Sequence, residues 1–519
     1  MNAPRTEAGG PAARWQWLAP VAFAGGFLLL GLLTLDAYGP TWDEPLHRSW
    51  GEANWLYLRT GDSSHIENLR GAGRHYGPFF YLLAYGLSTF FHEVIGLDFT
   101  AANHVPNLIA ASLGVACTFL LAERILNRRV AYAATTLLVL LPPFRAHAHY
   151  NPKDIPLLTL VTAALLFATI AWRSRRVPHA LLAGAFLGLA VAMKPTAVVI
   201  APVLAGALAL DIFPSRRDRL RDAIRLAVVA AIASAGALFA SWPFLWRQPL
   251  RLLESVAYFA RGSFWEGNVL YLGEMMPASE LPWHYTPVML LLAMPLVMAL
   301  LAATGSIRLV RRAREPRARF PAALLLLWAA LPLLLFLKPG LARYDGMRQL
   351  FFMIPALAIL AGEGWDSVWC RSSDRRYRRF IVGLSGVFMA WLAVEGVVAF
   401  PYGGSWVNPP ARVLLGPRLE RSIEVEYWGA PYREGLRWMR DNAPPDAVVC
   451  TPVAGHLIEW QPELVRADVE ADCTGQPHYV MLITRFAEWP DEYLALRDTE
   501  PVFTVSRFGS DLLAAYRVR

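Results

Sequence analysis

The chain has 519 residues, of which 55% are hydrophobic and only 17% charged, and its formal net charge is +8. Soluble domains carry about 25% charged residues, so this composition excludes an ordinary soluble enzyme, a disordered chain and a collagen-like fibre. The apolar residues are concentrated in runs such as 17–35 and 181–192, which suit a lipid environment. The sequence therefore predicts a polytopic membrane protein.

The positions of the arginines predict a topology. They cluster at alternate junctions between apolar runs, in the segments 124–129, 173–176, 216–221, 308–319 and 371–379. Short loops rich in Arg and Lys stay in the cytoplasm, so these basic segments indicate a membrane topology rather than nucleic-acid binding. The N-terminus is then cytoplasmic and the C-terminus extracytoplasmic. About eleven spans are predicted, at 16–35, 103–122, 130–143, 155–172, 180–194, 196–212, 226–245, 286–306, 322–337, 350–365 and 380–400.

Two segments are expected outside the membrane. Residues 36–102 form the first outer loop, and its apolar stretch 78–95 is predicted to be a helix along the membrane surface, because a span there would move the 124–129 cluster outside. Residues 1–400 form the predicted transmembrane domain. Residues 401–519 mix β-type runs (447–453, 479–484, 502–506) with helical patterns (431–442, 489–498), which predicts a small extracytoplasmic α/β domain.

The four cysteines fit this division. Cys117 falls in a predicted span and Cys370 in a cytoplasmic loop, so neither is expected in a disulfide. Cys450 and Cys473 share the outer domain, where an oxidising compartment would allow a disulfide. Two free structural thiols are the alternative of equal weight.

A pair of carboxylates follows the first span. Asp43 and Glu44 stand between Trp42 and Pro45 at the expected outer surface. Charged groups beside lipid are costly, and their presence there favours a functional role. The alternative is a helix N-cap, since Asp43 before Glu44-Pro45 also suits the start of a helix.

The outer loops also collect cations. All three lysines of the chain, Lys153, Lys194 and Lys338, are predicted on the side that topology rules disfavour, which indicates an anionic ligand at the membrane surface. Each has a plainer alternative: Lys194 could snorkel from a helix end, and Lys153–Asp154 or Arg343–Asp345 could be rim salt bridges. The spacing of His147 and His149 does not fit a helical zinc site, and His284 beside Trp283 suits packing or hydrogen bonding.

In their order and spacing these motifs resemble the GT-C glycosyltransferases of the protein O-mannosyltransferase type (glycosyltransferase family 39-like), a group that includes the aminoarabinose transferase acting on lipid A. The resemblance covers most of the chain. It rests on Asp43-Glu44, Tyr76-Gly77-Pro78, Pro152-Lys153-Asp154-Ile155-Pro156, Gly188-Leu189-Ala190 with Lys194-Pro195, Tyr344-Asp345-Gly346-Met347-Arg348 and Tyr427-Trp428-Gly429.

The resemblance implies a mainly α-helical, polytopic GT-C fold that transfers a sugar from a polyprenyl-phosphate donor to an acceptor on the outer side of the membrane. It implies Asp43 as general base and Glu44 as a supporting or acceptor-binding carboxylate. The lipid A enzymes have a Glu-Lys-Pro-Pro type sequence where this chain has His75-Tyr76-Gly77-Pro78. That departure removes a carboxylate ligand, so we predict no metal and no other cofactor, with a divalent cation still possible.

Elementary chemistry agrees with this assignment. A hydroxyl is a poor nucleophile, and a positioned carboxylate can take its proton as the new bond forms. The departing phosphate needs cations rather than a general acid, which fits single displacement with inversion. Candidate donor-phosphate ligands are Arg74, Lys153, Lys194, Arg343 and Arg348. Candidate acceptor or substrate contacts are His75, Tyr76, Asp154, His284 and Asp345.

The expected setting is the inner (plasma) membrane of a bacterium, with a lipid, glycan or protein as acceptor, surrounding membrane lipids as partners and no nucleic acid. Two other classes compete. A transporter or flippase of lipid-linked sugars would also use outer cations, but transporters usually place ionisable groups near mid-membrane and show repeated halves. A non-catalytic assembly subunit would not need Asp43.

Overall fold

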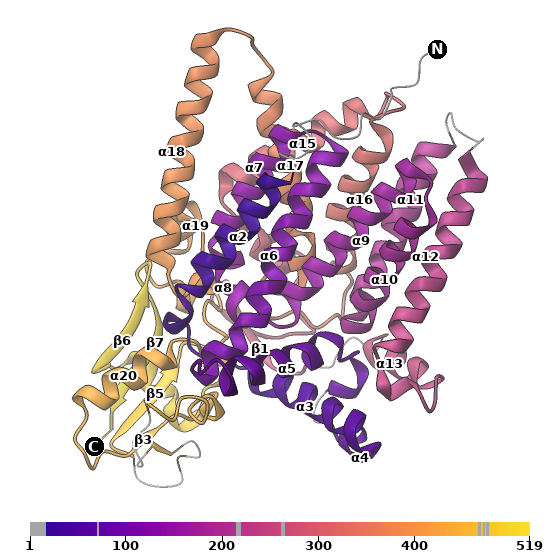
Figure 1. The fold of residues 1–519 in the computed structure, drawn as a ribbon. Helices are drawn as coiled ribbons and strands as arrows, with labels where there is room; N and C mark the ends of the chain where they lie inside the picture. The colour runs from indigo at the N-terminus through magenta and orange to yellow at the C-terminus, as the bar shows by residue number, and fades with distance from the viewer. Residues whose placement is uncertain are drawn as a thin grey trace.

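The computed structural model describes residues 17–69, 72–213, 219–260, 265–464, 469–470, 473 and 477–518. Within them a helical bundle carries a small sheet at one end (Figure 1). Six helices are long and apolar enough to cross a membrane, so the chain is a multi-pass membrane protein. They are Phe99–Ile125 (α6), Asp154–Ser174 (α9), Pro195–Ile212 (containing α11, Ile200–Ile212), Leu220–Ala240 (α12), Arg348–Trp369 (containing α17, Ile354–Trp369) and Arg375–Ala399 (α18).

Shorter helices complete the bundle: α2 (Leu18–Leu32), α7 (Arg128–Leu140), α10 (Val177–Met193), α14 (Tyr285–Leu292), α15 (Leu296–Arg312) and α16 (Arg319–Leu335). Each of the eleven expected spans overlaps one helix of the bundle, or the α14–α15 pair. The expected span 286–306 is not straight, because α14 and α15 meet at 115°. Pro295 stands at that break, where its missing N–H and fixed φ interrupt a continuous helix. The number of membrane crossings remains a prediction.

Small residues let the helices approach closely. A Cβ atom added at Gly305 of α15 would lie 1.9 Å from the carbonyl oxygen of Leu360 in α17, and one at Gly184 of α10 would lie 2.1 Å from that of Ala230 in α12. Such backbone contact is typical of helices packed in lipid, where apolar side chains alone give little drive for association.

The first outer loop forms helices at one end of the bundle. These are α3 (Glu44–Thr60), α4 (Ser64–Glu67) and α5 (Phe79–Glu93), and they lie across the bundle end that also carries the sheet (Figure 1). The expected surface stretch 78–95 therefore corresponds to α5, and its location at a membrane surface remains a prediction.

Arginine-rich turns gather at the opposite end. Arg129 and Arg308 both pair with Asp366 of α17, at 2.7 and 3.2 Å. Arg308 and Arg312 of α15 both reach Glu363, at 3.3 and 3.0 Å. The connection from α17 to α18 lies at this end, away from the sheet (Figure 1). Residues 216 and 217 of the predicted basic clusters and residue 16 of the first span lie outside the described residues.

The C-terminal part is an α/β unit whose sheet has the order β4-β3-β5-β7-β6. β3 is parallel to β4 and β5, whereas β7 is antiparallel to β5 and β6. Its elements are α19 (Pro409–Leu415), α20 (Tyr432–Asn442), β3 (Val449–Cys450), β4 (Val469–Glu470), β5 (Tyr479–Ile483), β6 (Phe503–Arg507) and β7 (Ser510–Arg517). The expected β-type runs and the helix at 431–442 all correspond to these elements, and residues 491–498 form a 3-10 helix.

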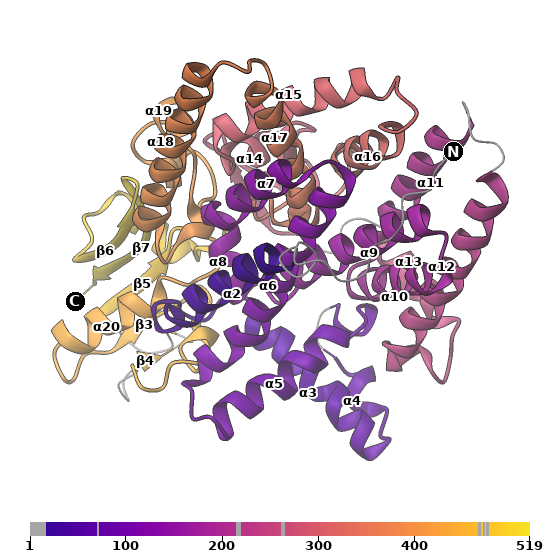
Figure 2. The same ribbon diagram turned by 45° about the horizontal axis from the view of Figure 1, so that its top comes forward.

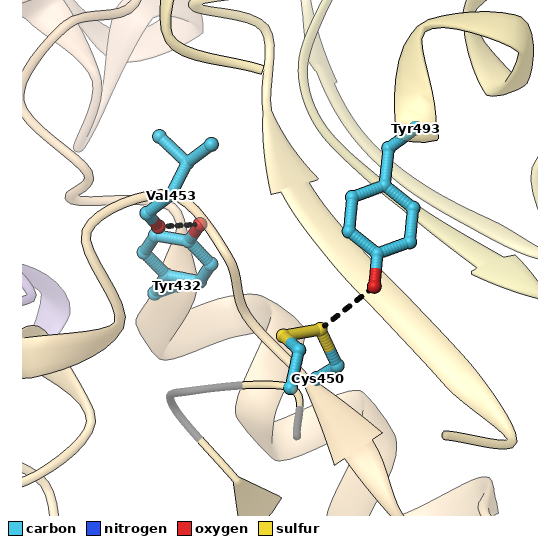
Figure 3. The surroundings of a disulfide bond; sticks show 5 residues. Tyr432, Cys450, Val453 and Tyr493 are labelled. Atoms are coloured by element: carbon cyan, nitrogen blue, oxygen red, sulfur yellow. Dashed lines mark hydrogen bonds between the residues drawn. A yellow bond between two sulfur atoms is a disulfide. The ribbon is translucent and has the colours of Figure 1, made fainter. Parts of the chain in front are cut away.

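Two further features tie this unit together and to the bundle. Cys450 and Cys473 form a disulfide, beside the hydroxyl of Tyr493 (Figure 3). Cys117 and Cys370 are free, as expected. A hairpin of β1 (Asn268–Tyr271) and β2 (Glu274–Pro277) precedes α14 and bridges to Ile423. In both views the sheet and α12 lie on opposite sides of the bundle (Figures 1 and 2).

Candidate functional site

Asp43 stands at the N-cap position of α3 but does not cap it. Its side chain makes no hydrogen bond to the helix backbone. Instead the carboxylate accepts a hydrogen bond from Nη1 of Arg348 at 2.7 Å, although the two residues are 305 positions apart. One quarter of the Asp43 side chain is exposed. The alternative of a helix cap therefore does not account for this carboxylate, which is left available at the end of the bundle.

Glu44 points in a different direction. Its carboxylate is buried, and it accepts hydrogen bonds from the backbone N–H and the hydroxyl of Thr41 at 2.7 and 2.9 Å. Nε2 of His104 in α6 lies 3.1 Å away. Thr41 in turn donates to the carbonyl oxygen of Tyr150. Glu44 thus fastens the start of α3 onto the bundle, while Asp43 remains turned toward Arg348.

The loop before α17 supplies Arg348 and its second partner. Asp345 and Gly346 both have left-handed backbone conformations, with φ of 55° and 61°, which Asp and Gly tolerate better than other residues. This turn brings the Asp345 carboxylate within 2.5 Å of Nη2 of Arg348. The guanidinium also lies 4.7 Å from the ring centre of Trp428, within the Tyr427-Trp428-Gly429 motif. Arg348 is therefore held between two carboxylates and an aromatic face.

A cavity of about 380 Å³ adjoins this cluster. All three lysines of the chain line it together with Arg348, so four cations surround one space. Its other walls include apolar side chains and two tyrosines. These are Phe259, Leu335, Phe336, Leu341, Tyr76 and Tyr344. A space lined by several cations and by apolar residues suits an amphipathic anion such as a lipid phosphate.

Acidic and aromatic groups position two of the lysines. Nζ of Lys194 lies 2.6 Å from a carboxylate oxygen of Asp154, and both side chains are almost fully buried. Asn151 donates to the other Asp154 oxygen at 3.1 Å. Nζ of Lys153 lies 4.1 Å from the centre of the Tyr76 ring, a cation–π distance. Lys338 is the exposed lysine of the cavity.

The two aspartates that contact Arg348 have pKa values shifted in opposite directions. Burial raises the pKa of Asp43, but nearby cations, chiefly Arg348, outweigh burial and hold its pKa below the ordinary value. At Asp345 burial dominates, so its pKa is raised in spite of Arg348 and Arg485. Burial lowers the pKa of His47, one helical turn after Asp43, to about 3, so this imidazole is neutral near pH 7.

Five of the residues predicted from sequence lie away from both the cavity and Arg348, and Glu44, on Thr41 and His104, is one of them. Arg343 is buried and donates to the carbonyl oxygens of Leu281 and Pro282, so it fixes a loop. Nδ1 of His284 lies 2.8 Å from the Tyr271 hydroxyl. The remaining two are Arg74, which is exposed, and His75, which stacks on Tyr258. Lys153, Lys194, Arg348, Tyr76 and Asp154 line the cavity, and Asp43 and Asp345 contact Arg348.

Sequence reasoning did not single out two buried charges from the C-terminal unit. Nη2 of Arg485 lies 3.1 Å from Asp345, and its Nε lies 3.1 Å from Glu424. Burial raises the pKa of Glu424 to about 7, against the opposing effect of Arg485. No local motif marks either residue, although an arginine that directly follows the apolar run 479–484 is an unusual neighbour for a buried strand. Within the described residues no group of three His, Cys, Asp or Glu side chains could hold a metal ion.

Comparison with known proteins is consistent with this geometry. A family model described as dolichyl-phosphate-mannose-protein mannosyltransferase matches residues 81–243. A search of curated proteins found no match. Among solved structures, ArnT from Cupriavidus metallidurans bound to undecaprenyl phosphate superposes with a TM-score of 0.52 at 18% identity, covering 95% of this chain and 97% of that chain.

A second solved structure has a similar fold. The oligosaccharyltransferase of Archaeoglobus fulgidus, in its apo form, superposes with a TM-score of 0.50 at 13% identity, covering 94% of this chain and 73% of that chain. Both likenesses concern the fold. The family resemblance expected from the sequence motifs is therefore supported by the family match over residues 81–243, and the chain shares its fold with both solved structures.

Proposed function

We propose that this protein is a membrane glycosyltransferase that moves a sugar from a polyprenyl-phosphate-linked donor to an acceptor hydroxyl. The observation that carries the proposal is the position of Asp43. This carboxylate does not cap α3 but contacts Arg348, and Arg348 lines the cavity together with the three lysines. A base and an anion-binding cavity thus meet at one arginine. The solved ArnT structure with undecaprenyl phosphate supports a lipid phosphate as the ligand class.

The proposed reaction is one displacement at the anomeric carbon of the sugar. The acceptor oxygen forms a bond to that carbon while the bond to the phosphate oxygen breaks. The acceptor proton passes to the Asp43 carboxylate, and the bonding electrons leave with the polyprenyl phosphate. Lys153, Lys194 and Arg348 stabilise the negative charge that grows on the phosphate. One displacement inverts the configuration at the anomeric carbon.

Arg348 links the binding of the donor to the strength of Asp43 as a base. Its charge holds the pKa of Asp43 low, which makes this carboxylate a weak base while the cavity is empty. A donor phosphate in the cavity would attract the same guanidinium and weaken its hydrogen bond to Asp43. The pKa of Asp43 would then rise toward its ordinary value, so the base becomes stronger when the donor is present.

The proposed setting is the extracytoplasmic face of a bacterial plasma membrane. The arginine-rich turns lie at the bundle end opposite the sheet, and such turns favour the cytoplasm. The disulfide lies at the other end, in the C-terminal unit, and disulfides persist in oxidising compartments. Cavity, Asp43 and sheet would then all face outward, where donor and acceptor meet.

Lipid mass spectrometry of cells with and without the protein tests the proposal. Cells with the protein should contain a sugar-modified product that is missing without it, while the polyprenyl-phosphate sugar accumulates in its absence. The Asp43→Asn variant should reproduce that loss. Glu52→Gln, an exposed carboxylate on the same helix, is the matched control and should retain the product. Full product with correctly folded Asp43→Asn would refute the role of the base and favour a transporter of lipid-linked sugars.

A further inference from the structure

Arg485 is a buried charge that the C-terminal unit contributes to the membrane-proximal site. It directly follows Thr484 at the end of β5, and its side chain is only 6% exposed. The guanidinium lies between Asp345 and Glu424 and over the ring of Trp42, 5.1 Å from its centre. Trp42 immediately precedes Asp43, and its backbone N–H donates to the carbonyl oxygen of Trp428 at 2.7 Å.

Together with the ion pairs already described, these contacts form one series of alternating negative and positive side chains. Asp43 pairs with Arg348, Arg348 with Asp345, Asp345 with Arg485, and Arg485 with Glu424. Buried ion pairs are stable only while every charge keeps its partner, because an isolated buried charge loses several kcal/mol of solvation. Changing one member must therefore disturb its neighbours. Asp345 is the shared partner that relates Arg485 to Arg348.

We propose that Arg485 is a positioning residue through which the C-terminal unit completes the active site. It keeps Asp345 ionised, and ionised Asp345 fixes the Arg348 guanidinium at the place where it meets both Asp43 and the cavity. This proposal rests on the proposed glycosyl transfer. Arg485 itself does not line the cavity, so it acts on the reaction through Asp345 and Arg348.

Loss of Arg485 has a defined electrostatic consequence. Burial already raises the pKa of Asp345, and Arg485 is one of two arginines that oppose this rise. Without Arg485 the pKa of Asp345 rises further, so a larger fraction of the carboxyl is protonated at a given pH and the ionic anchor of Arg348 weakens. The other charged or titratable groups that interact with Asp345 or Arg485 include Asp43, Asp154, Glu424, Glu488, Lys153, Tyr285, Tyr344 and Tyr427.

Transfer kinetics of the full-length protein in detergent test the proposal, with the donor being the polyprenyl-phosphate sugar purified from cells that lack the protein. Arg485→Leu should lower kcat roughly tenfold or more at neutral pH, as expected for a member of a coupled network. Part of that loss should be recovered as the pH is raised, because Asp345 becomes ionised again. Arg485→Lys keeps the charge and should retain more activity. The matched control is Arg507→Leu, which removes an ion pair with Glu434 and a cation–π contact with Tyr402 in the same unit.

A double variant tests whether Arg485 acts through Asp345. In an Asp345→Asn background, Arg485→Leu should cost little further activity, because the carboxylate through which it acts is gone. An equal fold-loss in both backgrounds, or an Arg485→Leu enzyme within about twofold of wild type, would overturn the proposal. Should Arg485→Leu fail to fold, Arg485→Gln takes its place in both backgrounds, and activity within about twofold of wild type would overturn the proposal equally. A wild-type protein without transfer in the same assay would instead refute the proposed function.

Discussion

Replacing Arg348 by methionine should move the acid limb of the pH–rate profile to higher pH. Asp43 must be deprotonated to act as base, and Arg348 holds its pKa below the ordinary value. Activity of the wild type should therefore persist into acid and disappear only as the pH falls through that low pKa. Without the guanidinium, burial dominates the pKa of Asp43, and activity is lost at a higher pH.

The size of the shift follows from Coulomb's law. Two unit charges about 4 Å apart interact by ~1 kcal/mol at the dielectric constant of water and by ~4 kcal/mol at an effective value of about 20. The Asp43 side chain is one quarter exposed, so its environment lies between these limits. Since one pKa unit corresponds to about 1.4 kcal/mol, the acid limb should rise by ~1 to ~3 pH units.

The assay is kcat/KM from the lowest pH at which the protein stays folded up to about pH 9, because the profile of kcat/KM reports the free enzyme, in which Arg348 contacts Asp43. The pH at which the acid limb lies reports the titration of Asp43, whereas the loss of a phosphate ligand lowers kcat/KM at every pH. Arg348→Lys keeps a positive charge and should shift the limb less. An active Arg348→Met enzyme whose acid limb coincides with that of the wild type would refute both Asp43 as the titrating base and its control by Arg348.

Two further predictions concern stability. The Cys450–Cys473 disulfide closes a loop with a sequence separation of 23, so the double Cys→Ser variant should lose about 3 kcal/mol of unfolding free energy in the C-terminal unit and become protease-sensitive there; unchanged proteolysis would contradict this. Lys194→Met leaves Asp154 buried without its cation and should cost ~3–5 kcal/mol, measured as a lower Tm in detergent. Adding Asp154→Asn should restore part of that Tm, and a further decrease would disprove the pairing.

The positions of the apolar helices were predictable from sequence because lipid demands long apolar runs. The convergence of the three lysines was predictable for a related reason, since Lys153, Lys194 and Lys338 all depart from the usual topology preference. The orientation of adjacent side chains could not be predicted from the sequence. Asp43 and Glu44 are neighbours, yet successive residues at a helix start point about 100° apart, and only one carboxylate can face Arg348. Packing against Thr41 and His104 decides that it is Asp43.

Long-range contacts limited the rest of the prediction. Arg343 and Arg348 stand in one loop and look equivalent in sequence, but the left-handed turn at Asp345 sends them to different neighbours. Arg485 lies in no recognisable motif. Its contact with Asp345 depends on how the end of β5 lies relative to Asp345, and the sequence does not show that placement. The bend between α14 and α15 had a visible cause in Pro295, although apolar periodicity alone favoured one straight span.

The series of ion pairs from Asp43 to Glu424 also bears on when the site can be completed during synthesis of the protein. Asp43 and Arg348 are 305 positions apart, and Asp345 and Arg485 are 140 positions apart. At ribosomal rates, Arg485 is added on the order of half a minute after Asp43. A nascent chain whose helices have already inserted still lacks the residue that fixes Asp345. Under the proposed function, donor lipid in the same membrane would be protected from unfinished molecules, because the C-terminal unit is translated after the helices and would complete the site.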